Sequence, residues 1–357
     1  MKLLQAVLVG VGPFEKLVLP FADAAGEARS LTVIHGASGV GKSSVLGAIA
    51  TTRPGHCIVQ PTRAEARESA PQPFAACDWA LGQDEPSRPH PLSVVSPNAR
   101  LSVTDEQEAL RRREQALFDR LAGEGGFAFL AIPSTRWFSR QPIGLSAPAR
   151  TVARYDVRAS ASADDATRAD LSRETKQALA YAAISRALAA RPTLPPQGER
   201  SFELLGAAMQ SAVDTLLSLA GCSYRGIDPL SFEPMFSVPG SPREQPFDAL
   251  PTRARHLTAF AALAVRTLWA AYPDQDPRES EGVIAIDEVD LHQDSRVQQQ
   301  LPRAFLEALP GAQWILTTAS PVLASAADAR GVLALRPLPE GAGEGIRVFA
   351  GDQARTH

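Results

Sequence analysis

The chain has 357 residues, 45% of them apolar, and a formal net charge of −3. This length and apolar content predict a soluble globular protein of one large or two ordinary domains with a sizeable core. The charge supplies no overall basic field, so a contact with nucleic acid would need a local arginine patch. Three widely spaced cysteines without a Cys-x-x-Cys pair favour neither a disulfide framework nor a zinc site and fit a reducing compartment.

No segment is predicted to enter a membrane. The first ten residues form an apolar run like that of a signal peptide, but Glu15 and Lys16 follow it, and we interpret the run as a strand. The longest later apolar stretch, residues 257–272, contains Arg266 and is too short to span a bilayer. We therefore expect a cytoplasmic protein.

The apolar pattern predicts a mixture of strands and helices along the chain. Short strands fill residues 1–35, and a helix-like stretch covers 44–50. Proline-rich segments from 61 to 100 predict surface loops and hairpins around one strand, 74–81. A helix at 105–123, a buried strand at 127–132, helices at 164–190 and 202–220 and a strand-and-loop region follow. The closing elements are helices at 257–272 and 295–309 and strands at 282–286, 313–318 and 332–334, the last strand expected.

An eight-residue motif follows the strand at 31–34. It is a complete phosphate-binding loop, Gly36-Ala37-Ser38-Gly39-Val40-Gly41-Lys42-Ser43, and Ser44 continues it into the helix. Glycines let backbone N–H groups turn inward around phosphate oxygens, and the N-terminus of the helix points at the same charge. Lys42, one of only four lysines among 36 basic residues, can reach the β- and γ-phosphates, and the Ser43 hydroxyl can bind Mg²⁺. The motif predicts that the chain binds a nucleoside triphosphate.

Two adjacent carboxylates follow the apolar strand at 282–286. Asp287 and Glu288 leave this strand at its carboxyl end, where α/β sheets bind nucleotides. We expect Asp287 to hold Mg²⁺, usually through water. We expect Glu288 to orient and polarise the attacking water, a contribution on the order of 10²–10⁴-fold for a positioned base. Lys42 and Asp287 are 245 residues apart, so the segment between them is predicted to elaborate a compact nucleotide-binding core.

Three segments resemble the ABC-type ATPases of the RecF, SMC and OLD kind, grouped broadly with AAA-family ATP-binding proteins. Residues 8–14 are similar to the strand and turn that begin these heads, and residues 287–292 to their Walker B and D-loop run. Residues 313–321 look like their strand ending in Thr-Thr-His-Ser-Pro. The resemblance implies ATP and Mg²⁺ as cofactors and assembly of two or more copies when nucleotide binds. No heptad pattern persists in the middle segment, so a long SMC-type coiled coil is disfavoured.

Two departures from that family fall at the γ-phosphate end. Residues 250–257 stand where the family's signature caps the nucleotide of the opposite subunit, and they lack its glycine and glutamate. Arg253 or Arg255 could supply charge there in trans, like an arginine finger, or could face solvent or pair with acidic neighbours. Ala319 stands where the family has its switch histidine. We therefore expect ATP binding but not fast hydrolysis.

Other residues keep two interpretations. Either Gln60 or Gln83 can be the glutamine that links the γ-phosphate to the middle segment. The run at 136–140 mixes arginines and aromatics as a nucleic-acid contact does, but packing of Trp137 and Phe138 in a core or lid is the better interpretation. His292 lies at the D-loop position, for which the resemblance implies communication across a dimer.

These features predict an α/β P-loop NTPase of the ABC-ATPase head type. We expect a nucleotide-binding core at 1–60 and 246–357 and an inserted mixed α+β region at 61–245. The expected function is a slowly ATP-hydrolysing switch that assembles on nucleotide, as a homodimer or higher oligomer, and signals to a partner. A protein partner is expected and nucleic acid is left open, and the resemblance associates the chain with DNA repair or phage defence. The alternative is an ATP-binding scaffold or sensor subunit with little or no hydrolysis.

Overall fold

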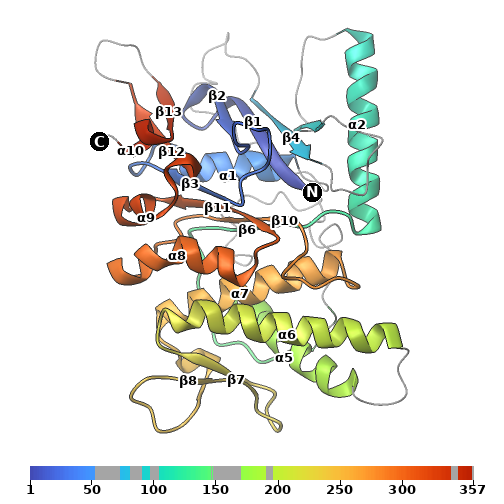
Figure 1. Cartoon of the computed structure of the whole chain (residues 1–357), viewed down its shortest axis with the longest axis vertical. Helices are drawn as coiled ribbons and strands as arrows, with labels where there is room; N and C mark the ends of the chain where they lie inside the picture. The colour runs from blue at the N-terminus through green and yellow to red at the C-terminus, as the bar shows by residue number, and fades with distance from the viewer. Residues whose placement is uncertain are drawn as a thin grey trace.

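Layers of sheet and helix alternate along the long axis of the molecule (Figure 1). The computed structural model describes residues 1–52, 73–80, 91–96, 104–145, 147, 170–189, 196–338 and 345–355. A four-stranded sheet and helix α1 (Lys42–Thr51) lie on one side of a six-stranded sheet. Helices α7 (Thr252–Ala271) and α8 (Ser295–Ala308) cover its other side. Beyond them lie α5 (Ser172–Ala189) and α6 (Pro196–Ser218), then a small sheet of β7 (Ser223–Ile227), β8 (Pro234–Ser237) and β9 (Gln245–Pro246).

The six-stranded sheet has the strand order β13-β12-β3-β11-β10-β6. Five of its strands are parallel: β3 (Leu31–His35), β6 (Phe129–Ile132), β10 (Gly282–Ile286), β11 (Ala312–Thr318) and β12 (Val332–Pro337). Every residue of β10 and β11 is buried, which explains the continuous apolar run of β10 and the apolar centre of β11. Because the strands are parallel, β3, β11 and β10 end at the same edge, and the loops that follow them meet there.

Strand β13 (Ile346–Ala350) corrects the expectation that β12 is the last strand. It pairs antiparallel with β12 at the edge of the sheet, and all of its residues are half-buried or exposed. An edge strand that buries so little apolar surface leaves a weak alternating pattern in the sequence, and the sequence analysis therefore missed it.

The four-stranded sheet is antiparallel, in the order β2 (Phe14–Pro20), β1 (Lys2–Val11), β4 (Phe74–Ala80) and β5 (Leu92–Val95). Helix α1 lies between the two sheets, where Val45 and Ile49 join one apolar cluster with Leu8 of β1 and Ile315 of β11. Contact with both sheets fixes the position of the N-terminus of α1. Helix α2 (Asp105–Glu124) attaches through Phe118, whose ring centre lies 4.9 Å from that of Phe127.

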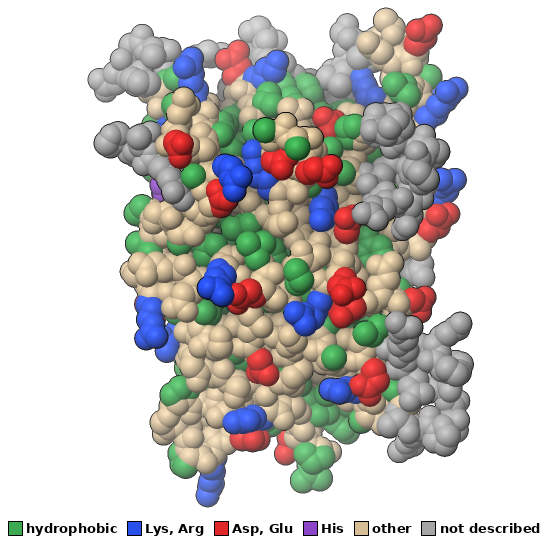
Figure 2. Space-filling model, in the orientation of Figure 1, with side chains coloured by type: hydrophobic (Ala, Val, Ile, Leu, Met, Phe, Trp, Pro, Cys, Tyr) green, Lys and Arg blue, Asp and Glu red, His purple; other side chains and the backbone are tan. Residues whose placement is uncertain are grey.

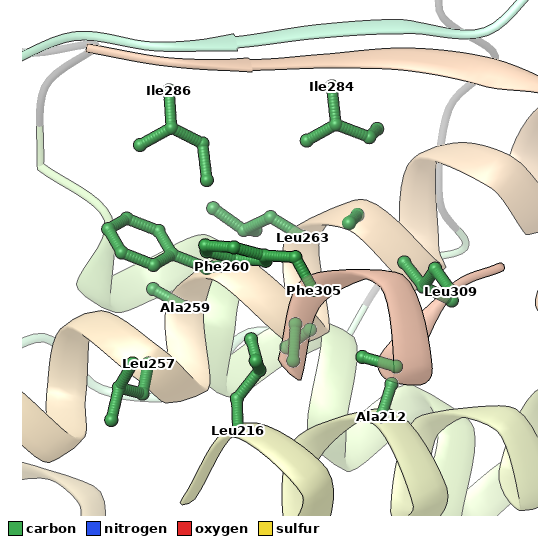
Figure 3. Close-up of a cluster of buried hydrophobic side chains, with 14 of the residues drawn as sticks. Ala212, Leu216, Leu257, Ala259, Phe260, Leu263, Ile284, Ile286, Phe305 and Leu309 are labelled. Carbon is green, nitrogen blue, oxygen red and sulfur yellow. The ribbon is translucent and has the colours of Figure 1, made fainter. Parts of the chain in front are cut away.

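The opposite face of the six-stranded sheet is covered by an apolar layer. Ile284 and Ile286 of β10 point toward Phe260 of α7 and Phe305 of α8 (Figure 3). Leu216 of α6 packs on the far side of these helices from the sheet. Helix α7 is buried on almost every side because it lies between the sheet and α6, and its apolar stretch at 259–265 covers the whole circumference of the helix. Pro196 opens α6 and Pro251 precedes α7, so both helices start earlier than their apolar residues alone predict.

Strands from the middle of the chain enter both large sheets, since β4 pairs with β1 and β6 pairs with β10. Helices α5 and α6 and the small sheet instead form the outer layers. The division into a core and an insertion at residues 60 and 245 stays a proposal. No helix in the described part of the chain is both long and apolar enough to cross a membrane.

Candidate nucleotide site

The phosphate-binding loop joins the end of β3 to the start of α1. Gly39 and Gly41 have φ angles of 84° and 89°, in the left-handed region that favours glycine. At Gly36 the constraint is space, because a Cβ there would lie 2.6 Å from the carbonyl oxygen of Leu335. A Cβ on Gly41 would also lie 2.6 Å from the ring of Phe14, so the turn between β1 and β2 packs against the loop. These three glycines are therefore required by the shape of the loop.

The other loop residues divide into an exposed rim and a buried anchor. Ala37 and Ser38 are exposed, whereas Val40 is buried in the apolar cluster around α1. Ser44 lies under the β1–β2 turn, since a Cβ on Gly12 would lie 2.6 Å from its hydroxyl oxygen. The loop is thus anchored through Val40 and Ser44, whereas Ala37 and Ser38 are accessible to solvent.

Lys42 folds back over the loop. Its ammonium donates to the carbonyl oxygens of Gly36 at 2.8 Å and Ala37 at 2.9 Å, and the residue is only 5% exposed. A buried charge must be hydrogen-bonded or paired, and these carbonyls satisfy that need. The positive charge is therefore held against the loop backbone, where a bound phosphate would meet it.

The two halves of the site meet in one hydrogen bond. The Ser43 hydroxyl donates to Oδ2 of Asp287 at 2.7 Å, across 244 residues of sequence. The other carboxylate oxygen, Oδ1, accepts from the hydroxyl of Thr317 at the end of β11. Asp287 is 5% exposed, so the loop and the ends of two strands hold its carboxylate in place.

Glu288 occupies a constrained turn directly after β10. Its φ angle is 44°, a left-handed conformation that residues other than glycine adopt at a cost on the order of 1–3 kcal/mol. The turn is held because the Glu288 N–H donates to Thr317 Oγ1 at 2.8 Å and the N–H of Val289 donates to the Thr317 carbonyl at 3.0 Å. Constrained backbone of this kind is concentrated at functional sites.

Three solved structures share this architecture over almost the whole chain. A structure of the Smc head bound to the C-winged helix domain of ScpA superposes with a TM-score of 0.54, at 15% sequence identity and over 99% of both chains. The SMC head domain from Thermotoga maritima gives a TM-score of 0.51, at 16% identity, over 99% of this chain and 100% of that one. A Pyrococcus furiosus Smc head with an extended coiled coil, bound to the C-terminal domain of ScpA, gives a TM-score of 0.50 at 17% identity, over 98% of this chain and 96% of that one.

The chain has the fold of an SMC head. This confirms the expected fold class, an α/β head of the ABC-ATPase type. No protein-family model and no curated protein matches the sequence, so the likeness to SMC heads is one of fold.

Arg136 is a residue of this SMC-head fold that the sequence analysis did not assign to the site. It follows β6, is 5% exposed, and its Nη1 donates to the carbonyl oxygen of Asp287 at 2.6 Å. Its Nη2 donates to the carbonyl oxygen of Glu288 at 2.7 Å. Burial lowers the pKa of Arg136 to about 10, against the opposing effect of the nearby carboxylates, so it stays protonated at neutral pH. The packing interpretation of the run at 136–140 holds for Phe138, whose ring lies 5.8 Å from that of Phe247, but Trp137 is 46% exposed.

The structure places Arg253 and Arg255 in the first turn of α7. Arg253 donates to Oδ2 of Asp294 at 3.0 Å, with both side chains largely exposed. Arg255 donates to Thr252 Oγ1 at 3.2 Å, and its guanidinium lies 5.4 Å from the centre of the Phe138 ring. Arg253 thus pairs with an acidic neighbour, as one of the two interpretations expected, and a role toward a second copy stays a proposal.

Two histidines meet beside the carboxylate turn. His292, in a left-handed conformation with φ of 66°, places its ring 5.0 Å from that of His256. His256 is 1% exposed, and its Nδ1 donates to the carbonyl oxygen of Thr252 at 2.8 Å. Burial is the main reason that the pKa of His256 is lowered to about 4. The ring is therefore neutral at pH 7.

An imidazole also lies beside Ala319, although it comes from another strand. His35 ends β3 next to Gly36, and its ring hydrogen-bonds to the backbone of Ala319. Burial lowers the pKa of His35, the bond to Ala319 raises it, and the charges of Lys42 and Arg336 lower it further. The sequence analysis did not identify His35, because only strand pairing brings it to Ala319. Gln60 and Gln83 lie outside the described residues.

Proposed function

We propose that the chain binds ATP with Mg²⁺ and hydrolyses it slowly, as a switch that pairs with a second copy and signals to a partner. The observation that carries the proposal is the hydrogen bond between Ser43 and Asp287. It joins the phosphate-binding loop to the carboxylate strand, so that residues suited to the triphosphate and to its metal ion lie together.

The residues at this point fit Mg²⁺. Magnesium takes oxygen ligands, and Ser43 and Asp287 supply a hydroxyl and a carboxylate. Ser43 Oγ lies 2.7 Å from Asp287 Oδ2, so the hydroxyl would hold the ion directly and the carboxylate would hold it through a water molecule. When bound, the ion would neutralise charge on the phosphates.

The remaining residues of the site would bind the phosphates and activate the attacking water. The loop backbone and Lys42 bind the β- and γ-phosphates and stabilise their charge. Glu288 orients a water molecule and accepts its proton as the water oxygen attacks the γ-phosphorus and ADP leaves. Low turnover is expected because Ala319 offers no side-chain hydrogen bond to the γ-phosphate and Arg253 is engaged by Asp294.

A partner protein is the better candidate for what the switch controls. Two of the solved SMC heads are bound to domains of ScpA, so this fold can carry a small protein domain. On the described part of the face in Figure 2, Lys and Arg side chains are interspersed with Asp and Glu rather than gathered in one basic patch. We propose that the outer layers between residues 61 and 245 transmit the nucleotide state. If duplex DNA at low salt leaves ATP binding and turnover unchanged, a protein partner is favoured, whereas stimulation would favour DNA.

The test compares the wild type with Glu288→Gln and Lys42→Ala. We expect the wild type to bind ATP and hydrolyse it slowly, Lys42→Ala to lose affinity for ATP, and Glu288→Gln to keep the affinity while losing turnover. Because retained ATP should hold two copies together, Glu288→Gln should also double its mass in light scattering when ATP is added. A wild type that binds no ATP would contradict the proposal.

The alternative function is an ATP-binding scaffold or sensor subunit without hydrolysis. Ala319 and the ion pair between Arg253 and Asp294 favour it, since both leave the γ-phosphate end of the site less equipped for chemistry. The two functions are separated by turnover. A wild-type rate no greater than that of Glu288→Gln, with ATP bound by both proteins, would establish the scaffold.

A further inference from the structure

The carbonyl groups of the carboxylate turn are held by one buried guanidinium. Arg136 donates through Nη1 to the carbonyl oxygen of Asp287 at 2.6 Å and through Nη2 to that of Glu288 at 2.7 Å. Nη1 also donates to the carbonyl oxygen of Pro133, at 3.0 Å. The planar fork of arginine suits two adjacent acceptors, which the single ammonium of a lysine cannot match.

A buried cation is costly unless its surroundings compensate for lost water. Arg136 is 5% exposed, and its guanidinium carbon lies 5.1 Å from the centre of the Phe260 ring. The charges of Asp287, Glu288 and Asp290 favour its protonated form. An apolar side chain would fill this space but would leave the carbonyl oxygens of Asp287 and Glu288 without these bonds, so the fork has a task that packing alone does not explain.

That task is visible at Glu288. Its N–H is bonded to Thr317 Oγ1 and its carbonyl oxygen to Arg136, so the peptide groups on both sides of its Cα are held. The left-handed φ of 44° depends on such restraints, and the direction of the side chain follows from the backbone that carries it. We propose that Arg136 is a positioning residue that fixes Glu288 for its work as the base. This rests on the proposed function.

Arg136 is itself anchored to the helical layers. The carbonyl of Trp137 accepts from the N–H of Leu171 at 3.0 Å, and the Ser139 N–H donates to Oδ1 of Asp170 at 3.1 Å, just before α5. The ring of Phe138 lies 4.9 Å from that of His256 in α7. The segment 136–139 therefore ties the turn that carries Glu288 to the start of α5 and to α7.

The test uses Arg136→Lys, which keeps the charge, and Arg136→Gln, which keeps hydrogen-bonding capacity without it. Arg140→Gln is the matched control, because Arg140 directly follows the segment 136–139 but is exposed. We expect kcat to fall about 10- to 100-fold in both Arg136 variants, with the Kd for ATP within about threefold of the wild type, and no change in Arg140→Gln. Wild-type kcat in Arg136→Lys would overturn the proposal, as would a loss of ATP affinity in proportion to kcat.

A double variant separates positioning from general stabilisation. If Arg136 acts through Glu288, the double variant Arg136→Lys/Glu288→Gln has the same kcat as Glu288→Gln, because the base is already absent. A further loss in the double variant equal to that of Arg136→Lys alone would show that Arg136 acts elsewhere. The proposed function fails separately, if Glu288→Gln itself turns over ATP as fast as the wild type.

Discussion

Replacing Thr317 with valine tests how the carboxylate turn is held. Thr317 is completely buried at the end of β11, and its hydroxyl donates to Asp287 while accepting from the N–H of Glu288. Valine keeps the shape and loses both bonds. A hydrogen bond to a charged group contributes about 1.5–3 kcal/mol, and an unpaired buried N–H costs about 1–3 kcal/mol. We expect the free energy of unfolding to fall by about 3–5 kcal/mol, and kcat for ATP to fall about 10-fold or more as Glu288 loses a restraint.

Thr318→Val is the matched control. Thr318 is equally buried, donates to Oδ1 of Asp290 and accepts from the N–H of Ser320 at 2.9 Å. Its loss should destabilise the protein by a similar amount in urea titrations while leaving kcat within about threefold of the wild type. Equal effects of the two variants on kcat, or wild-type turnover in Thr317→Val, would refute the view that Thr317 orients the reacting groups.

Three further predictions concern His256, the loop glycines and Arg253. Because the pKa of His256 is about 4 in the folded protein and near 6.5 in the unfolded chain, the unfolded chain binds more protons between these values. The contribution of His256 to the free energy of unfolding is therefore fully present above pH 6.5 and decreases by up to about 3 kcal/mol as the pH falls to 4. His256→Gln should flatten this part of a plot of unfolding free energy against pH. Gly41→Ala should abolish ATP binding in a fluorescent-nucleotide titration and lower the Tm more than Gly39→Ala does. Both positions have a left-handed φ, but only at Gly41 would the added Cβ also meet Phe14. Equal shifts in Tm would contradict this explanation. Arg253→Ala should leave ATP turnover unchanged if the ion pair with Asp294 is its whole role, and a large fall in turnover would instead establish it as a finger toward a second copy.

Two parts of the candidate site can be recognised in the sequence because short windows of residues encode them. The glycines of the loop and the apolar strand before Asp287 each follow from a short window of residues, and the parallel sheet then brings Ser43 to Asp287. The buried strands β10 and β11 were also recognisable, since β10 is a continuous apolar run and β11 has an apolar centre, Trp314-Ile315-Leu316.

Arg136, Thr317 and His35 could not be assigned in the same way. Arg136 reaches Asp287 across 151 residues, and only the pairing of β6 with β10 puts them side by side. Thr317 and His35 reach their hydrogen-bond partners because β11 lies between β10 and β3, which is the order of strands in space rather than in sequence. A single sequence gives the periodicity of each strand but not its neighbours.

The most direct test of the proposed ATPase is a single-turnover measurement. Protein in excess of ATP is mixed with Mg²⁺, and conversion to ADP is followed over time in the wild type and Glu288→Gln. We predict that both proteins bind all of the ATP, and that the wild type converts it at a rate at least about 100-fold above that of the variant. ATP left unbound by the wild type, or converted equally by both proteins, would contradict the assignment of this site.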